Sequence, residues 1–267
     1  MSRTVVVTGG ASGIGRALAR ELVARGAHVT VADVRNAEET AAELGCAHAV
    51  LDVTDAGAVR DLFAAVRDEH GRLDYVFNNA GIAIGGYADE MTLDHWNAAI
   101  DVNLRGVVHG VHAAYPIMVR QGFGHIVNTA SLAGLTPAPL MAPYTASKHA
   151  VVGLSLALRA EAAARGVRVS VVCPGFVDTP LLDHANPGLP PTEVGEQARR
   201  AAVRAQGRLY PVDALVRDIL RGVARNRALI VAPASARFAW RLARLSPALA
   251  TRAAGLAVRR ARWQSGR

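Results

Sequence analysis

The chain has 267 residues, of which 51% are apolar and 19% are charged, which excludes a disordered chain and leaves material for one or two domains. Its two cysteines exclude a disulfide-stapled scaffold, and no run of about 20 apolar residues exists to span a membrane. The net charge of +8 resides in residues 237–267, which hold eight Arg and no acidic residue, whereas the other residues hold 22 basic and 22 acidic side chains. A neutral body does not favour a nucleic-acid partner. The first residues leave no room for a signal peptide, so we expect a cytoplasmic protein.

Short β-branched runs alternate with helical patterns as far as residue 180. The expected strands are Thr4–Thr8, His28–Ala32, Ala47–Leu51, Tyr75–Phe77, Gly124–Asn128 and Arg168–Val172. Helical patterns follow the first strand and recur at about 55–68, 92–121 and 144–165. Apolar strands separated by helices predict a doubly wound, mostly parallel α/β sheet of the Rossmann type.

The pattern changes after residue 180. Residues 192–206 and 211–225 look helical, and Ala228–Val231 is a candidate last strand. We expect a single domain over residues 1–235 and a basic amphipathic helical tail over residues 236–267. Ser246–Pro247 divides the tail into two helices.

A glycine-rich turn follows the first strand. It reads Thr8-Gly9-Gly10-Ala11-Ser12-Gly13-Ile14-Gly15 and leads directly into a helix, which is the arrangement that binds a nucleotide phosphate. Asp33 ends the second strand, where a carboxylate accepts hydrogen bonds from ribose hydroxyls and repels a 2′-phosphate, so the sequence favours NAD over NADP. Arg35 could weaken that preference. A glycine turn and a capping Asp without any ligand is the alternative.

Tyr144 and Lys148 are four residues apart and therefore share one face of a helix. An ammonium on that face favours the phenolate and would lower the pKa of Tyr144. Lys148 is also the only lysine beside 29 arginines, and an arginine could not relay protons. Ser131 precedes Tyr144 by 13 residues and could hold a carbonyl or alcohol oxygen beside the phenol.

Together these motifs resemble the short-chain dehydrogenase/reductase family, over residues 4 to about 180. The resemblance also rests on Asp52-Val53, Asn78-Asn79-Ala80-Gly81, Asn103 in the run DVNLRG, and Pro174-Gly175 with Thr179. It implies an NAD-dependent oxidoreductase in which Tyr144 is the acid/base on the substrate oxygen and Ser131 orients that oxygen. Lys148 would bind the nicotinamide ribose, and Asn103 would bend its helix and hold a water that links Lys148 to solvent.

The resemblance also assigns the rest of a cofactor site. Gly9, Ser12, Gly13, Ile14 and Gly15 would bind the phosphates, and Asp33 the adenosine ribose. The remaining cofactor residues would be Asp52, Val53, Asn79, Ala80, Gly81, Tyr144, Lys148, Pro174, Gly175, Val177 and Thr179. No metal is implied; His109 and His112 lie three apart but lack a ligand partner at metal spacing, so we interpret them as surface or interface residues.

The substrate is expected to be an uncharged, lipophilic secondary alcohol or ketone, such as a hydroxysteroid. Residues 180–210 would form a lid, and no Arg or Lys occurs among the apolar pocket candidates. These are Ile82, Ala83, Ile84, Leu132, Leu140, Met141, Leu181, Leu182, Leu189 and Tyr210.

The remaining expectations concern assembly, the role of the tail and the alternative functions. The family assembles through helices 92–121 and 144–165, which implies a homotetramer or homodimer. In the tail, Phe238, Leu242, Leu245 and Leu249 share one helix face beside arginines, which suits either packing on the body or a neighbouring subunit, or an anionic membrane surface. The alternative functions are a non-catalytic NAD(H)-binding sensor or scaffold and a membrane-docked interaction module.

Overall fold

The structure, a computed structural model, describes residues 2–264 and is built on one seven-stranded parallel sheet. The strand order is β3-β2-β1-β4-β5-β6-β7, so the chain winds outward from β1 in both directions. The doubly wound α/β prediction is therefore confirmed. The strands are β1 Thr4–Thr8, β2 His28–Asp33, β3 Ala47–Val50, β4 Tyr75–Asn78, β5 Gly124–Thr129, β6 Val167–Pro174 and β7 Leu229–Ala232.

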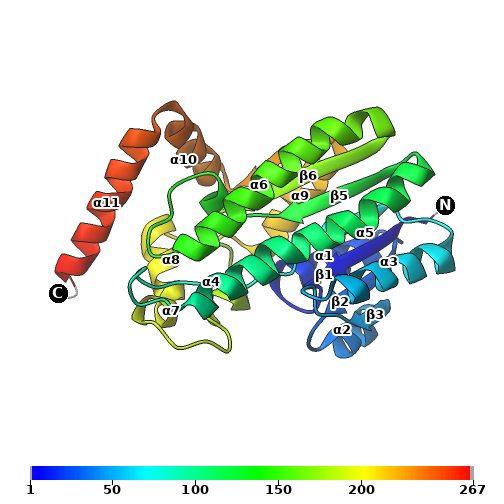
Figure 1. The fold of residues 1–267 in the computed structure, drawn as a ribbon, viewed down its shortest axis with the longest axis horizontal. Helices are drawn as coiled ribbons and strands as arrows, with labels where there is room; N and C mark the ends of the chain where they lie inside the picture. Colours follow the sequence, from blue (N-terminus) through cyan, green and yellow to red (C-terminus); the bar gives the residue numbers. More distant parts are fainter. Residues whose placement is uncertain (1, 265–267) are drawn as a thin grey trace.

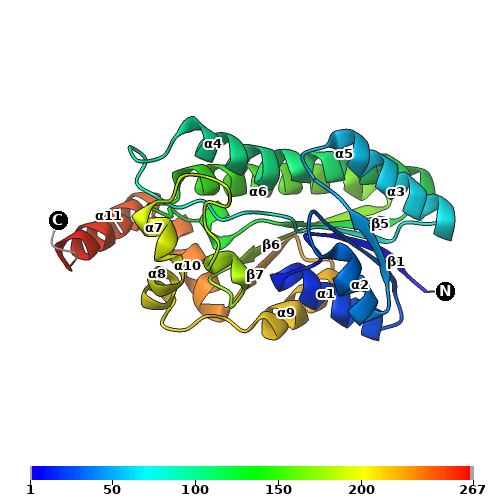
Figure 2. The ribbon, with the colours of Figure 1, turned by 90° about the horizontal axis from the view of Figure 1, so that it is seen from below.

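Helices cover both faces of the sheet, because successive buried strand residues point to opposite sides (Figure 2). Val5 and Val7 pack with α1 (Gly13–Ala24) and α9 (Val212–Ala224). Val6, between them, packs with the opposite layer. That layer contains α3 (Ala56–His70), α5 (Gly106–Gln121) and α6 (Ala142–Ala162).

Three helical segments differ from the pattern in the sequence. The expected helix over 92–121 is α4 (Leu93–Ile100) and α5 joined by a π-helical turn over Asp101–Arg105. The expected helix over 192–206 is divided at Gln197 into α7 (Glu193–Glu196) and α8 (Ala198–Gln206). The additional α2 (Ala37–Leu44) is only eight residues long, too short for a distinct apolar stripe.

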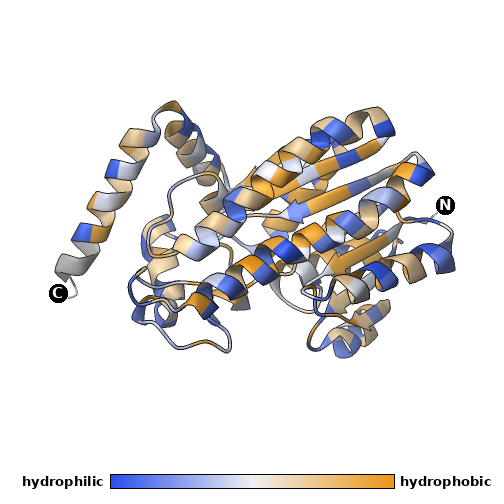
Figure 3. Ribbon diagram, viewed as in Figure 1, coloured by the Kyte–Doolittle hydropathy of each residue, from blue (hydrophilic) through white to orange (hydrophobic). Residues whose placement is uncertain are grey.

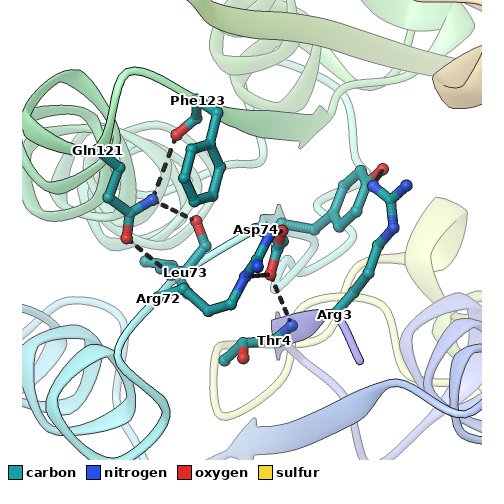
Figure 4. A network of polar contacts seen from close by, with 8 residues as sticks. Arg3, Thr4, Arg72, Leu73, Asp74, Gln121 and Phe123 are labelled. Carbon is teal, nitrogen blue, oxygen red and sulfur yellow. Dashed lines mark hydrogen bonds and ion pairs between the residues drawn. The ribbon is translucent and has the colours of Figure 1, made fainter. Parts of the chain in front are cut away.

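A polar network closes the amino-terminal edge of the sheet, opposite the carboxyl ends of the strands (Figure 4). The Asp74 carboxylate accepts a hydrogen bond from the Thr4 backbone N–H at 2.9 Å and pairs with Arg72 at 2.5 Å. The Gln121 side chain bonds to both backbone groups of Leu73. These contacts tie β1, β4 and the end of α5 together, so this edge is occupied by structural contacts.

The C-terminal helices α10 (Ala234–Leu245) and α11 (Pro247–Gln264) follow β7 and lie at the same end of the molecule as α7 and α8 (Figures 1 and 2). Ala236 and Trp240 pack against the body. Phe238, Leu242 and Leu245 lie on the other side of α10, with exposures of 66%, 51% and 83%. The apolar face of the tail therefore does not pack on the body of this chain. Residues 265–267 of the expected tail lie outside the described residues.

Among the described residues, no helix is long and apolar enough to cross a membrane.

Candidate active site

The residues expected to act on substrate meet where β5 and α6 adjoin. Ser131 follows the end of β5 and begins a short 3₁₀ turn, in which its hydroxyl accepts a hydrogen bond from the Ala133 N–H. Tyr144 and Lys148 lie on the first turns of α6, where Pro143 near the helix start favours initiation. Both side chains are buried, with 8% and 3% exposure.

Lys148 is a buried cation with an unusual set of neighbours. Its Nζ donates to the Thr129 carbonyl at 3.1 Å and lies 5.5 Å from the centre of the Tyr144 ring. Burial lowers the pKa of Lys148 to about 8. An ammonium with this pKa gains and loses a proton near neutral pH, as a proton relay requires.

The pKa of Tyr144 departs from the expectation that Lys148 lowers it. Burial raises this pKa above its ordinary value, and a hydrogen bond with the Ser131 side chain opposes the rise without cancelling it. The physical reason is that desolvation of the phenolate outweighs the local stabilisation. At neutral pH the Tyr144 hydroxyl is therefore protonated and placed to donate.

Asn103 lies in the π-helical turn and is fully buried. Its Oδ1 accepts from the Ile82 N–H at 2.9 Å and its Nδ2 donates to the Ile82 carbonyl at 3.1 Å. The side-chain amide of Asn103 thus links the π-helical turn to the loop after β4. A Cβ on Gly81 would lie 2.9 Å from Asn103 Oδ1 and 3.4 Å from Lys148 Nζ, so Gly81 permits this close packing.

The glycine turn after β1 is packed closely enough to require glycine. A Cβ on Gly9 would lie 2.7 Å from the Ala80 Cα, and one on Gly15 would lie 2.0 Å from the Gly9 carbonyl oxygen. Gly9 and Gly13 also have positive φ, at 61° and 50°. Ser12 is the N-cap of α1, but its side chain makes no capping bond. The result is a cradle of backbone N–H groups with an uncommitted hydroxyl, which fits a diphosphate.

The next cofactor candidates flank this turn. The Asp33 carboxylate accepts from the Ala11 N–H at 3.0 Å and from the Arg35 N–H at 3.3 Å, while the Arg35 residue is exposed. Asp52 caps its own turn through Thr54, and Val53 is buried. The structure therefore holds Asp33 rigidly at the turn.

Asn79 joins the turn to the neighbouring strand. Its side chain donates to the carbonyls of Thr8 and Gly9, and the Thr8 hydroxyl accepts from the N–H groups of Asn79 and Ala80. On the other side, the Thr179 side chain lies 3.3 Å from the position of a Cβ on Gly13. The segment from Pro174 through Gly175 and Val177 reaches this point from β6. All the expected cofactor residues thus gather at the carboxyl ends of the strands, where doubly wound sheets bind ligands.

An apolar cluster surrounds Tyr144. Besides Tyr144, its members are Ile82, Ile84, Met91, Ala99, Ala133, Ala138, Met141 and Leu189. Tyr210, expected in the same pocket, packs instead with the α9 layer, and its hydroxyl donates to Asp218 at 2.9 Å. That expectation was wrong because the aromatic ring joins the core on the opposite face of the sheet.

The roles of several supporting residues were not predicted from the sequence. Asn78 donates to Asn128, which donates to Ser155 on α6, and this buried chain ties the sheet to the helix that carries Tyr144. The signal was available, since Asn78 and Asn128 each stand at or near the end of an apolar strand. Cys173 lies beside Lys148, and burial raises the pKa of its thiol to about 12, so it remains protonated.

Neither histidine of the pair on α5 belongs to a metal centre in the structure. His109 Nδ1 bonds to the Val53 carbonyl at 2.8 Å and His112 is exposed. Across residues 2–264, no three His, Cys, Asp or Glu side chains come together as a metal site.

Comparison with known proteins identifies the family. The model of the short chain dehydrogenase family matches residues 3–189. D-beta-hydroxybutyrate dehydrogenase of Rhizobium meliloti is 35% identical over 196 residues, covering 70% of this chain and 76% of that protein. Levodione reductase of Leifsonia aquatica is 35% identical over 210 residues, covering 75% and 77%.

A solved structure extends the likeness beyond the matched region. The structure of a short chain dehydrogenase/reductase from Burkholderia phymatum in complex with NAD has a TM-score of 0.83 at 34% identity, and covers 93% of this chain and 95% of that one. The family model, the relatives and the solved structure agree on the family. The chain belongs to the short chain dehydrogenase family of enzymes.

Proposed function

We propose that the protein is an NAD-dependent oxidoreductase that interconverts a secondary alcohol and a ketone. The observation that carries this proposal is the placement of Ser131 beside the buried Tyr144 and Lys148, at the same sheet edge as the glycine turn. The relatives named as dehydrogenases and reductases support it.

The proposed mechanism assigns one task to each side chain. Ser131 holds the substrate oxygen beside the Tyr144 hydroxyl. In ketone reduction, Tyr144 donates its proton to that oxygen, and in alcohol oxidation the phenolate takes the proton back. Lys148 would hold the ribose hydroxyls of a bound cofactor, and its ammonium would supply the proton that restores Tyr144. The nicotinamide ring supplies the hydride acceptor or donor when it is bound.

The preference for NAD is proposed from Asp33. Its carboxylate is held at the glycine turn by the Ala11 N–H, where it would accept from ribose hydroxyls and repel a 2′-phosphate. Arg35 is exposed and two residues away, so it is the residue that would favour NADP if the preference were reversed.

The substrate is proposed to be lipophilic and uncharged. An apolar cluster packs with Tyr144, and a charged substrate group placed among these side chains would lose its hydration. Hydroxysteroids and long secondary alcohols have this character.

Absorbance at 340 nm with NAD+ and NADP+ in parallel, over a panel of hydroxysteroids and secondary alcohols, tests these assignments. We expect turnover with NAD+, and Tyr144→Phe should lose at least about a hundredfold in kcat. Because the pKa of Tyr144 is raised, oxidation should accelerate as pH rises above neutrality. Tight NADH binding with no turnover on any substrate would instead favour the sensor or scaffold alternative.

We also propose that the tail docks this cytoplasmic enzyme on an anionic lipid surface. Beyond the exposed apolar face of α10, Leu249 and Leu256 on α11 are also exposed, at 63% and 54%. Figure 3 shows hydrophilic and hydrophobic residues alternating along both helices, and the exposed arginines of α10 include Arg241 and Arg244. A second copy of the chain would be a poor partner for this tail, because its body is neutral and its own tail is also rich in arginine. An anionic lipid surface, in contrast, stabilises each nearby arginine by about 1 kcal/mol.

Flotation with vesicles of phosphatidylglycerol and phosphatidylcholine tests this docking. The protein should float with these vesicles, less so at high salt, and not with phosphatidylcholine alone. Leu245→Glu should abolish flotation, whereas Leu93→Glu, which changes an equally exposed leucine on α4, should not. No flotation, or a dimer that Leu245→Glu dissociates, would contradict the lipid proposal and favour a second copy.

A further inference from the structure

The loop that faces Tyr144 is fastened to the body by a compact set of hydrogen bonds. This loop, residues 183–197, is called the substrate loop below. The Asn186 side chain accepts from the Gly85 N–H at 3.0 Å and donates to the Gly85 carbonyl at 2.9 Å. The Thr192 hydroxyl also donates to the Gly85 carbonyl and accepts from Asn186 Nδ2 at 3.0 Å. Two side chains of the substrate loop thus grip both polar groups of one residue in the loop after β4.

We propose that Asn186 and Thr192 are positioning residues that hold the substrate loop closed over Tyr144 before substrate binds. The proposal rests on the oxidoreductase function above. By holding the loop, these two residues would determine the shape of the substrate pocket.

The contact of Asn186 and Thr192 with Gly85, called the clasp below, is buried and closely packed, as a preformed contact requires. Asn186 and Thr192 are only 5% and 7% exposed. A Cβ on Gly195 would lie 2.8 Å from Asn186 Nδ2, and one on Gly86 would lie 2.9 Å from Thr192 Cγ2. Asn186 has a φ of 55°, a conformation that asparagine tolerates better than most residues. Sequence, packing and backbone conformation therefore agree on one geometry for this contact.

The loop after β4, which the clasp holds, is hydrogen-bonded to the segment just before α6, the helix that carries Tyr144. The Gly86 N–H donates to the Leu140 carbonyl at 2.9 Å, two residues before α6 begins. Leu140 has a φ of 65°, which is strained for a branched residue and persists only where neighbours enforce it. The substrate loop, the loop after β4 and the start of α6 are thus linked in series.

Two further contacts bring the loop over the pocket. Fully buried His95 on α4 contacts the Pro190 carbonyl through Nε2 at 3.0 Å. The adjacent Leu189 packs in the apolar cluster that contains Tyr144. When the clasp is closed, Leu189 is therefore a wall of the pocket, and its loss should weaken substrate binding more than the chemical step.

A matched pair of variants tests the Thr192 hydroxyl, which also accepts a hydrogen bond from the Gly195 N–H at 3.0 Å as the N-cap of α7. Thr192→Val keeps the shape of the side chain but removes the hydroxyl, whereas Thr192→Ser keeps the hydroxyl. Hydrogen–deuterium exchange of residues 183–197 is measured without substrate, and KM and kcat are measured with the best alcohol from the panel. Glu196→Gln, at an exposed position on the same loop, serves as the control.

We expect slow exchange in the wild type, in Thr192→Ser and in Glu196→Gln, and exchange at least about tenfold faster in Thr192→Val. Thr192→Val should raise KM about tenfold and lower kcat much less, since the lost contacts position the loop rather than the reacting atoms. Equal exchange in Thr192→Val and the wild type, or a fall in kcat at constant KM, would overturn the proposal. The exchange measurement needs no turnover, so a failure of the proposed function leaves this test intact.

Discussion

Lys148 carries a positive charge into the interior, where its ammonium donates a hydrogen bond to the Thr129 carbonyl. Its exposure is 3%, and the lowered pKa near 8 reports the free energy that its burial costs. A buried cation that lowers stability is retained only where its charge is needed. This residue is therefore where activity and stability should conflict most directly.

Replacing Lys148 by Met should abolish turnover and stabilise the fold. At pH 7 we expect the free energy of unfolding to rise by about 1–2 kcal/mol. Between pH 8 and 10.5 the unfolded wild type binds more protons than the folded one, so wild-type stability rises with pH and the difference should shrink. Urea unfolding of both proteins at pH 7 and pH 10 measures this, and a destabilised variant at pH 7 would contradict it.

His125 should govern how stability changes at acid pH, whereas Lys148 acts at alkaline pH. Burial, and then Arg168 and Arg159, lower its pKa from 6.5 to about 3, so it stays neutral beside the Ser170 hydroxyl. Its contribution to stability is complete above pH 6.5 and is lost as the pH falls towards 3, because only the unfolded state gains the proton. At pH 4.5 the stability lost in this way is about 2–3 kcal/mol.

His125→Gln removes that titration and retains a donor for Ser170. Thermal melting from pH 7 to pH 4 should therefore show a shallower loss of Tm in the variant than in the wild type. Parallel curves would show that His125 is not the group responsible.

At the scale of elements, the strands and the glycine turn were predictable because each depends on local sequence. Thr4–Thr8 has three consecutive valines, and the glycines that follow it mark a turn that leads into a helix. The π-helical turn at Asn103 was not predictable as such, because its extra residue is stabilised by contacts with Ile82, 21 positions away. The clasp at Gly85 was not predictable from the sequence for the same reason, since Asn186 is separated from Gly85 by 101 positions in the chain.

The glycine turn also gives a prediction for an element. Gly15→Ala would place a methyl group 2.0 Å from the Gly9 carbonyl oxygen and 2.7 Å from Asn79 Nδ2, so the turn must open. We expect NADH affinity to fall more than about tenfold in a fluorescence titration, with the far-ultraviolet circular dichroism unchanged. Gly255→Ala, where a Cβ meets nothing within 4 Å, is the matched control and should bind NADH normally.

For the whole molecule, the surfaces divide by role. The amino-terminal edge of the sheet is closed by Asp74 and Gln121, and the carboxyl edge holds Tyr144 and the glycine turn. The tail leaves from the end of β7, at the carboxyl edge, and so extends from the catalytic side. A lipid surface bound by α10 would then lie on the side from which a lipophilic substrate arrives.

The remaining surface is the outer face of α5 and α6, through which we propose that the chain forms a homodimer or homotetramer. On α6, Ala146, Ala150, Gly153 and Ala157 are exposed, and Val108 on α5 is 41% exposed. Small side chains at these spacings let a second helix approach closely, and a Cβ on Gly153 meets nothing in the monomer.

Gly153→Arg should therefore leave the monomer folded and disrupt assembly. Light scattering after gel filtration should give a multiple of the 28.0 kDa chain mass for the wild type and a single chain for this variant. Ala65→Arg, at an exposed position on α3, should assemble like the wild type. A wild type that elutes as a single chain would refute the assembly, whereas an unchanged oligomer in Gly153→Arg would place the interface elsewhere, with the exposed face of α10 as the next surface to test.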